Sequence, residues 1–145
     1  MTGYADASFL TSIYVIDRNS QVAAETLQSV SADIIVSEFA WTETINAIYQ
    51  FCFRNAIRRS EADRASSTFA ADIQAGIMFL RELPASTYLL SRSISSQWTP
   101  DFGTRTGDVI HLAACLELKC DALFSFDRRQ RALAEKVSVK CLPHL

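Results

Sequence analysis

Short apolar runs alternate with longer amphipathic segments along most of this chain, and that alternation restricts the fold more than any other sequence feature. Apolar runs rich in β-branched residues predict buried strands, here at residues 3–6, 33–37, 87–90, 122–126 and 137–142. Helical spacing of apolar residues predicts helices at residues 7–15, 21–29, 38–58, 60–82, 108–119 and 127–135. Residues 97–107, which carry Pro100 and two glycines, are the one loop-rich stretch. The pattern predicts an α/β protein: a central parallel sheet with helices on both faces.

The length and charge of the chain exclude several classes of protein. With 145 residues, a single domain spanning residues 1–145 is expected. Fourteen basic residues against sixteen acidic ones leave a net charge of −2, which argues against a protein that coats nucleic acid by bulk electrostatics. No charge-free stretch exceeds ten residues, so no membrane segment is expected. Because no Lys or Arg precedes Arg18, a secretory signal is not expected either, and we predict a cytoplasmic protein.

The cysteines and histidines limit the metal chemistry. The four cysteines form no C-x-x-C pair and are expected to be reduced and mostly buried. Two histidines, His111 and His144, cannot build a His-rich zinc site. A bound metal would therefore be held by oxygen, which favours Mg²⁺ or Mn²⁺. The glycine patterns of dinucleotide and P-loop sites are absent.

Four carboxylates stand where the predicted strands and helices meet. Asp6 ends the first strand, Asp127 follows the run 122–126, and Asp108 opens a helix, whereas Glu43 lies in the helix after the second strand. Ligands of open parallel sheets bind outside the carboxyl ends of the strands, so these acids can converge on one site. Each aspartate also has a structural interpretation, because Asp is a preferred helix cap and is favourable in a first turn.

Glu43 is harder to explain as a structural residue. It is the only charged residue between Phe39 and Phe53, whereas a solvated helix face carries several charges. Its side of the helix otherwise shows small or neutral residues, namely Ala40, Asn46, Ala47 and Gln50. A lone carboxylate in such a helix is either paired or binds something, and a divalent cation is an efficient partner.

Four segments resemble the motifs of the PIN-domain family, in the order and at the spacings found there: residues 4–8 (Y-A-D-A-S), 37–47 (S-E-F-A-W-T-E-T-I-N-A), 105–114 (R-T-G-D-V-I-H-L-A-A) and 125–129 (S-F-D-R-R). Together with the length, they resemble VapC-type toxins, the ribonuclease half of bacterial toxin–antitoxin pairs. The chain departs from the family at Gly107, which suggests that the helix of Asp108 starts later than in a typical member. Residues 91–106 match nothing that we can align.

The resemblance implies a metal-dependent endoribonuclease that is inhibited by a cognate antitoxin and is commonly a homodimer. It implies that Asp6 and Asp108 are the core ligands of Mg²⁺ or Mn²⁺, and that Glu43 and Asp127 complete the acidic, catalytic pocket. Substrate RNA is expected to contact three further residues, Ser8, Arg128 and Arg129. The two arginines are suspected because cations at the start of a helix oppose its dipole and so need another reason to be there.

Two other functions stay open at this stage. One is a non-catalytic protein-interaction module of the same fold, in which the acids serve as helix caps. The other is a receiver-type phosphotransfer domain, which also gathers acids at strand ends. The receiver interpretation is the weaker one, because it needs adjacent acids near the N-terminus and Asp6 has no acidic neighbour.

Overall fold

The computed structural model describes residues 1–145 and contains a five-stranded, all-parallel sheet in the order β3-β2-β1-β4-β5. Its strands are β1 (Thr2–Ala5), β2 (Asp33–Ser37), β3 (Phe79–Arg81), β4 (Ala122–Phe124) and β5 (Cys141–Leu142). The seven helices are α1 (Ala7–Tyr14), α2 (Ser20–Ser29), α3 (Glu38–Phe53), α4 (Arg59–Gln74), α5 (Ser86–Phe102), α6 (Thr106–Glu117) and α7 (Arg128–Lys136). The predicted α/β class and parallel sheet are therefore confirmed. None of these helices is both long and apolar enough to cross a membrane.

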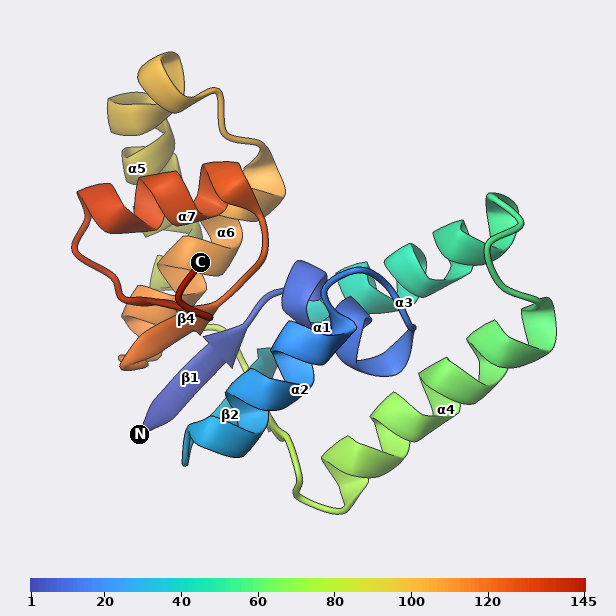
Figure 1. The fold of residues 1–145 in the computed structure, drawn as a ribbon. Coiled ribbons are helices and arrows are strands. Elements are labelled where there is room, and N and C mark those ends of the chain that lie inside the picture. Colours follow the sequence, from blue (N-terminus) through green and yellow to red (C-terminus); the bar gives the residue numbers. More distant parts are fainter.

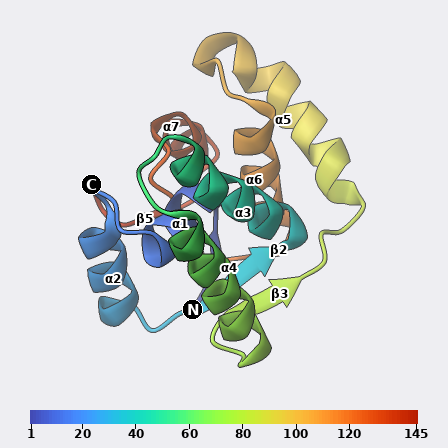
Figure 2. The ribbon, with the colours of Figure 1, turned by 90° about the vertical axis from the view of Figure 1, so that its right-hand side faces the viewer.

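Helices cover both faces of the sheet. The chain leaves β1 toward β2 and β3 and later returns to β4 and β5 on the other side of β1. Because crossovers between parallel strands are right-handed, this reversal puts α1 to α4 on one face and α5 to α7 on the other. Figures 1 and 2 show the two groups of helices on opposite sides of the strands, with both chain termini close to the sheet.

The core lies between the sheet and both helical layers. Fully buried aromatic rings come from β1, α1, α4 and β4, and they are Tyr4, Phe9, Phe69 and Phe124. Phe9 packs edge-on against Phe124, with ring centroids 5.1 Å apart. The central strands are buried on both faces, which explains why β2 and β4 read as continuous apolar runs instead of alternating ones.

The third strand is not where the sequence predicts it. Residues 87–90 belong to α5, and the strand is Phe79–Arg81, inside the segment predicted as the end of a helix. The buried side chains of α5 are Thr87, Ser91 and Ile94, a helical spacing that packs against α6 and overrides the local strand propensity of residues 87–90. Gly76, with φ of +72°, follows the end of α4 and allows the chain to turn into β3.

Other boundaries also differ from the prediction. The helix α3 ends at Phe53 instead of residue 58, and Asn55 follows in a left-handed conformation with φ of +57°. The expected loop 97–107 is largely helical, because α5 continues through Pro100 to Phe102. Pro100 lies in the last turn, and Gly103, with φ of +58°, ends the helix. The last predicted strand, residues 137–142, shrinks to Cys141–Leu142, because the chain turns after α7 with Ser138 in a left-handed conformation (φ +60°).

The close packing of β1 against β4 leaves no room for a side chain at Gly3. A Cβ atom there would overlap the ring of Phe124, which is fully buried and cannot move aside freely. We expect Gly3→Ala to lower the free energy of unfolding by about 1–3 kcal/mol, as overpacking does in cores. Urea unfolding measures this change. A stability equal to that of the wild type would show that the Phe124 ring repacks without cost.

Candidate active site

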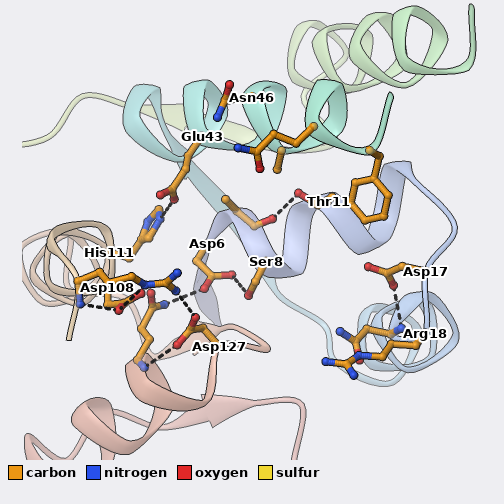
Figure 3. A pocket seen from close by; sticks show the side chains of 17 residues that line it. Asp6, Ser8, Thr11, Asp17, Arg18, Glu43, Asn46, Asp108, His111 and Asp127 are labelled. Atoms are coloured by element: carbon orange, nitrogen blue, oxygen red, sulfur yellow. Dashed lines mark hydrogen bonds and ion pairs between the residues drawn. The ribbon is translucent and has the colours of Figure 1, made fainter. Parts of the chain in front are cut away.

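The site lies at the carboxyl edge of the sheet, where the strand order reverses at β1. A crevice forms at such a switch point, because the connections from neighbouring strands leave in opposite directions. Asp6 directly follows β1, and Ser125 directly follows β4, so the two side chains meet across the crevice. A cavity of about 710 Å³ opens there, lined mostly by polar side chains. Figure 3 shows this cavity from close by.

Asp6 is the deepest carboxylate of the site, with only 2% of its surface exposed. Its Oδ1 accepts hydrogen bonds from Ser8 Oγ (2.7 Å) and from the Phe9 N–H (2.9 Å), so that Asp6 caps α1. Its Oδ2 accepts from Ser125 Oγ (2.6 Å) and Gln130 Nε2 (2.9 Å). Burial raises the pKa of Asp6, whereas these donors favour its ionised form.

Asp108 and Asp127 are also helix caps, and one arginine joins them. Asp108 Oδ2 accepts the Arg105 N–H at 2.8 Å in a capping box of α6, and Asp127 Oδ1 accepts the backbone N–H groups of Arg129 and Gln130 at the start of α7. The Arg105 guanidinium donates from Nη2 to Asp127 Oδ2 (2.7 Å), and its Nε lies 3.5 Å from Asp108 Oδ2. A side-chain cation thus spans two of the predicted metal ligands.

Capping and site chemistry are therefore not alternatives for these aspartates. A carboxylate has two oxygens with about four acceptor positions, and capping uses only part of them. In Asp127, Oδ1 caps α7 while Oδ2 faces Arg105, and in Asp108 only Oδ2 has a partner. The caps fix each carboxylate relative to its helix, which positions the remaining acceptor sites at the cavity.

Glu43 is held at the end of a chain of hydrogen bonds that is buried from Ser37 to His111. Its Oε2 lies 2.5 Å from His111 Nε2, His111 Nδ1 lies 3.0 Å from the Tyr4 hydroxyl, and that hydroxyl lies 2.7 Å from Ser37 Oγ. Ser37 Oγ in turn accepts the Ala40 N–H at the start of α3. All groups are satisfied when each hydroxyl donates toward His111 and Nε2–H donates to Glu43, a tautomer that we assign from the network. The hydrogen bond from His111 lowers the pKa of Glu43.

Gly107 permits the approach of Glu43. The expectation that the helix begins after Gly107 is wrong, because α6 begins at Thr106 and includes Gly107. A Cβ atom at this position would lie 2.8 Å from Glu43 Oε1. The glycine that departs from the family motif therefore leaves space for the carboxylate of another helix, which explains it better than a shifted helix start.

Most of the predicted site residues line the cavity, as Figure 3 shows for the labelled ones. These are Asp6, Ser8, Glu43, Asp108 and Asp127. Arg128 and Arg129 are exposed at the start of α7 and do not line it, so their contact with RNA stays a prediction. Three further residues line the cavity that the sequence pattern does not predict there, namely Arg18, Arg105 and His111. The sequence spacing could have predicted His111 at the site, because it lies one turn after Asp108 and therefore on the same side of α6.

The donor set suits Mg²⁺ or Mn²⁺, but the carboxylates are not arranged around a common point. Four carboxylates reach one cavity from four segments of the chain, and oxygen is the ligand that these cations prefer. No three Asp, Glu, His or Cys side chains lie close enough together to hold a metal ion as they stand. Arg105 contacts Asp108 and Asp127 and neutralises both. The donor chemistry suits a divalent cation, and Asp6, Glu43, Asp108 and Asp127 would hold it once Arg105 leaves and their oxygens come closer together.

Comparison with known proteins identifies a family and a set of similar folds. The PIN domain family model matches residues 4–136. VapC20 of Mycobacterium tuberculosis, described as a sarcin–ricin loop cleaving toxin, superimposes with a TM-score of 0.67 at 15% identity, covering 90% of this chain and 93% of that one. VapBC2 of Rickettsia felis, solved with a DNA fragment from its promoter, gives 0.70 at 7% identity, with 97% of each chain covered. FitAcB of Neisseria gonorrhoeae gives 0.66 at 12% identity, with 99% of each chain covered. No curated protein sequence is significantly similar.

The space left by Gly107 can be tested without disturbing the fold. Gly107→Ala should change the free energy of unfolding by no more than about 1 kcal/mol, because the higher helix propensity of Ala offsets the cost of moving the Glu43 carboxylate away from His111. The same change should displace Glu43 and weaken Mn²⁺ binding roughly 10- to 100-fold in calorimetry. In a Glu43→Ala background, Gly107→Ala should have no further effect on Mn²⁺ affinity. An additional loss there would mean that the glycine acts by another route.

Removing Arg105 should strengthen metal binding. Arg105→Gln leaves two carboxylates without their cation, so Mn²⁺ no longer competes with a guanidinium, and its affinity should rise on the order of tenfold. Arg92→Gln is the matched control, since it removes the same charge from an exposed position that does not line the cavity. Calorimetric titration measures both variants. Equal Mn²⁺ affinity in wild type and Arg105→Gln would show that Arg105 does not oppose the metal.

Proposed function

The chain belongs to the PIN-domain family, and we propose that it is a metal-dependent endoribonuclease of the VapC-toxin kind, inhibited by a cognate antitoxin. The observation that carries this proposal is the convergence of Asp6, Glu43, Asp108 and Asp127 on one cavity at the switch point of the sheet. No serine or cysteine is hydrogen-bonded to a histidine, and no zinc ligand set competes with them there. The description of the M. tuberculosis neighbour as a sarcin–ricin loop cleaving toxin supports the same class of reaction.

The proposed roles of the site residues centre on a bound divalent cation. A bound Mg²⁺ or Mn²⁺ lowers the pKa of water and neutralises charge on a phosphodiester. Asp6 and Asp108 would hold the cation, with Glu43 and Asp127 beside them. Ser125 and Gln130 hold Asp6 in one orientation through its Oδ2. The hydrogen bond from His111 lowers the pKa of Glu43, which keeps this carboxylate ionised and able to attract the cation.

Two further features concern contacts with RNA. Ser8 donates to Asp6 and accepts the Phe126 N–H (2.8 Å), so we propose that it acts on the substrate chiefly by orienting Asp6. The Arg105 side chain is mostly exposed. If a divalent cation took its place on Asp108 and Asp127, Arg105 would be free to contact a phosphate. Arg128 and Arg129, exposed beside Asp127, are proposed to contact phosphates farther along the strand.

An antitoxin is the proposed protein partner. The neighbours from R. felis and N. gonorrhoeae support a toxin–antitoxin pair. The contact of Arg105 with Asp108 and Asp127 demonstrates that the pocket accommodates a guanidinium group. An antitoxin arginine or lysine inserted there would silence the pocket by the same interaction. We also propose a homodimer, which is common among toxins of this type.

A non-catalytic interaction module is the second candidate. It is favoured by one observation: every carboxylate of the pocket already has a partner within the chain, and no ready-made metal site exists. The receiver-type alternative loses its support, because the chain matches the PIN family over residues 4–136.

Cleavage of single-stranded RNA separates the two candidates. The purified protein should cut RNA in Mn²⁺ or Mg²⁺ and stop in EDTA. Asp6→Asn and Asp108→Asn should each reduce the rate of cutting more than about 100-fold. Loss of a residue that only hydrogen-bonds a metal ligand typically costs roughly 10- to 100-fold. Asp33→Asn, at the opposite edge of the sheet, is the matched control and should cut normally. Gel analysis of RNA fragments measures the rate, and undiminished cutting in EDTA would falsify the metal mechanism.

A further inference from the structure

The cavity extends well beyond the four carboxylates. Along α3 its wall continues from Glu43 through Asn46 and Ala47 to Gln50, a spacing of three, four and seven residues that puts them on one side of the helix. Across from α3, the connection between α1 and α2 contributes Arg18. Figure 3 shows Arg18 at the end of the cavity away from Asp108 and Asp127, with α3 running between the two ends.

The two ends of the cavity differ in how their polar groups are used. At the acidic end, every carboxylate has a hydrogen bond or ion pair within the chain. At the other end, the side chains of Asn46, Gln50 and Arg18 are exposed and form no hydrogen bond or ion pair with the rest of the chain. Their donors and acceptors are therefore free to bind a ligand.

The loop that carries Arg18 is held in place by hydrogen bonds that do not involve the Arg18 guanidinium. Asp17 accepts from Ser12 Oγ (2.8 Å) and from the Asn19 N–H (2.7 Å), and the Asp17 N–H donates to Ser20 Oγ (2.9 Å). The neighbouring carboxylate thus braces the turn between α1 and α2 instead of pairing with Arg18. The guanidinium is left as the unpaired cation of a cavity that is otherwise rich in carboxylates.

The chemistry of this end fits one nucleotide of single-stranded RNA. An amide offers a donor and an acceptor side by side, which matches the edge of an unstacked base, and a guanidinium matches a phosphate. Phe51, half-buried in the same wall, adds an apolar surface on which a base can stack. At 1.5 Å of rise per residue, Asn46 lies about 4.5 Å and Gln50 about 10 Å along α3 from Glu43, so both are within reach of a nucleotide beside the acidic end.

We propose that Asn46 and Gln50 read the base, and Arg18 binds the phosphate, of a nucleotide adjacent to the bond that is cut. This inference rests on the proposed ribonuclease function and names the part of the site that selects its RNA sequence. It assigns selectivity to a helix face that also carries Glu43, so recognition and cleavage share one rigid element. None of the three residues belongs to the acidic end.

Cleavage preference tests the role of the amides. Wild type, Asn46→Ala, Gln50→Ala and the double variant are given a single-stranded RNA of randomised sequence, and the cut positions are sequenced. In the double variant, the base preference at one position next to the cut should fall about tenfold, while the Mn²⁺ affinity stays that of the wild type. Gln97→Ala, an exposed glutamine on α5, is the control and should keep the wild-type preference.

RNA binding tests the role of Arg18. In an Asp108→Asn background that does not cut, Arg18→Gln should weaken binding of any sequence and reduce the salt dependence of log affinity by about 0.7, the value for one lost phosphate contact on a single strand. Arg54→Gln, an exposed arginine outside the cavity, should leave the slope unchanged.

The outcomes separate this inference from the function on which it rests. A wild-type protein that neither cuts nor binds RNA overturns both. A wild type that cuts, with the same preference in the double amide variant and the same salt slope in Arg18→Gln, overturns the nucleotide subsite and leaves the ribonuclease intact. A shifted preference with unchanged Mn²⁺ affinity supports the subsite, because a general loss of folding would lower both.

Discussion

The buried carboxylate of Asp6 is the constraint on which the rest of the site depends. An ionised group in a nearly inaccessible position is costly unless its oxygens are satisfied. Asp6 is satisfied by a hydroxyl and an N–H from α1, a hydroxyl that follows β4 and an amide from α7. These donors tie together two neighbouring strands and the helices from both faces of the sheet. The requirement to solvate one carboxylate therefore fixes the geometry of the whole crevice.

The same logic explains how an acidic pocket folds without a metal ion. Carboxylates that share a cavity repel one another unless a cation or a donor lies between them. This chain supplies Arg105 for Asp108 and Asp127, and His111 for Glu43. The charge compensation of Asp108 and Asp127 can change, because the Arg105 side chain is mostly exposed and can leave. That of Glu43 cannot, because His111 is buried. One end of the acidic cluster is thus open to exchange, and the other is held fixed.

Local patterns were sufficient to predict the fold class and the four acids. β2 was predicted at its observed boundaries, because three consecutive β-branched residues, Ile34, Ile35 and Val36, lie between polar Asp33 and Ser37. The aspartates were found because they stand at strand ends and helix starts, which are visible in sequence. Residues 79–102 were misassigned because a short strand, Phe79–Arg81, is stabilised by its pairing with β2, and α5 by its packing on α6. Contacts of that kind lie far apart in sequence and leave no local pattern.

The positively charged side chains illustrate the same limit at the site. Arg128 and Arg129 are predicted to contact RNA because they oppose the dipole of their own helix, a property that depends only on the helix on which a residue lies. The cavity instead receives Arg105 from the turn before α6 and Arg18 from the turn between α1 and α2. Both are placed by the sheet, which brings distant connections to one edge, and each is positioned by a neighbouring aspartate that caps a helix or braces a turn. In a fold of this kind, the acids at strand ends can be predicted from the sequence, whereas the cations that meet them depend on the topology.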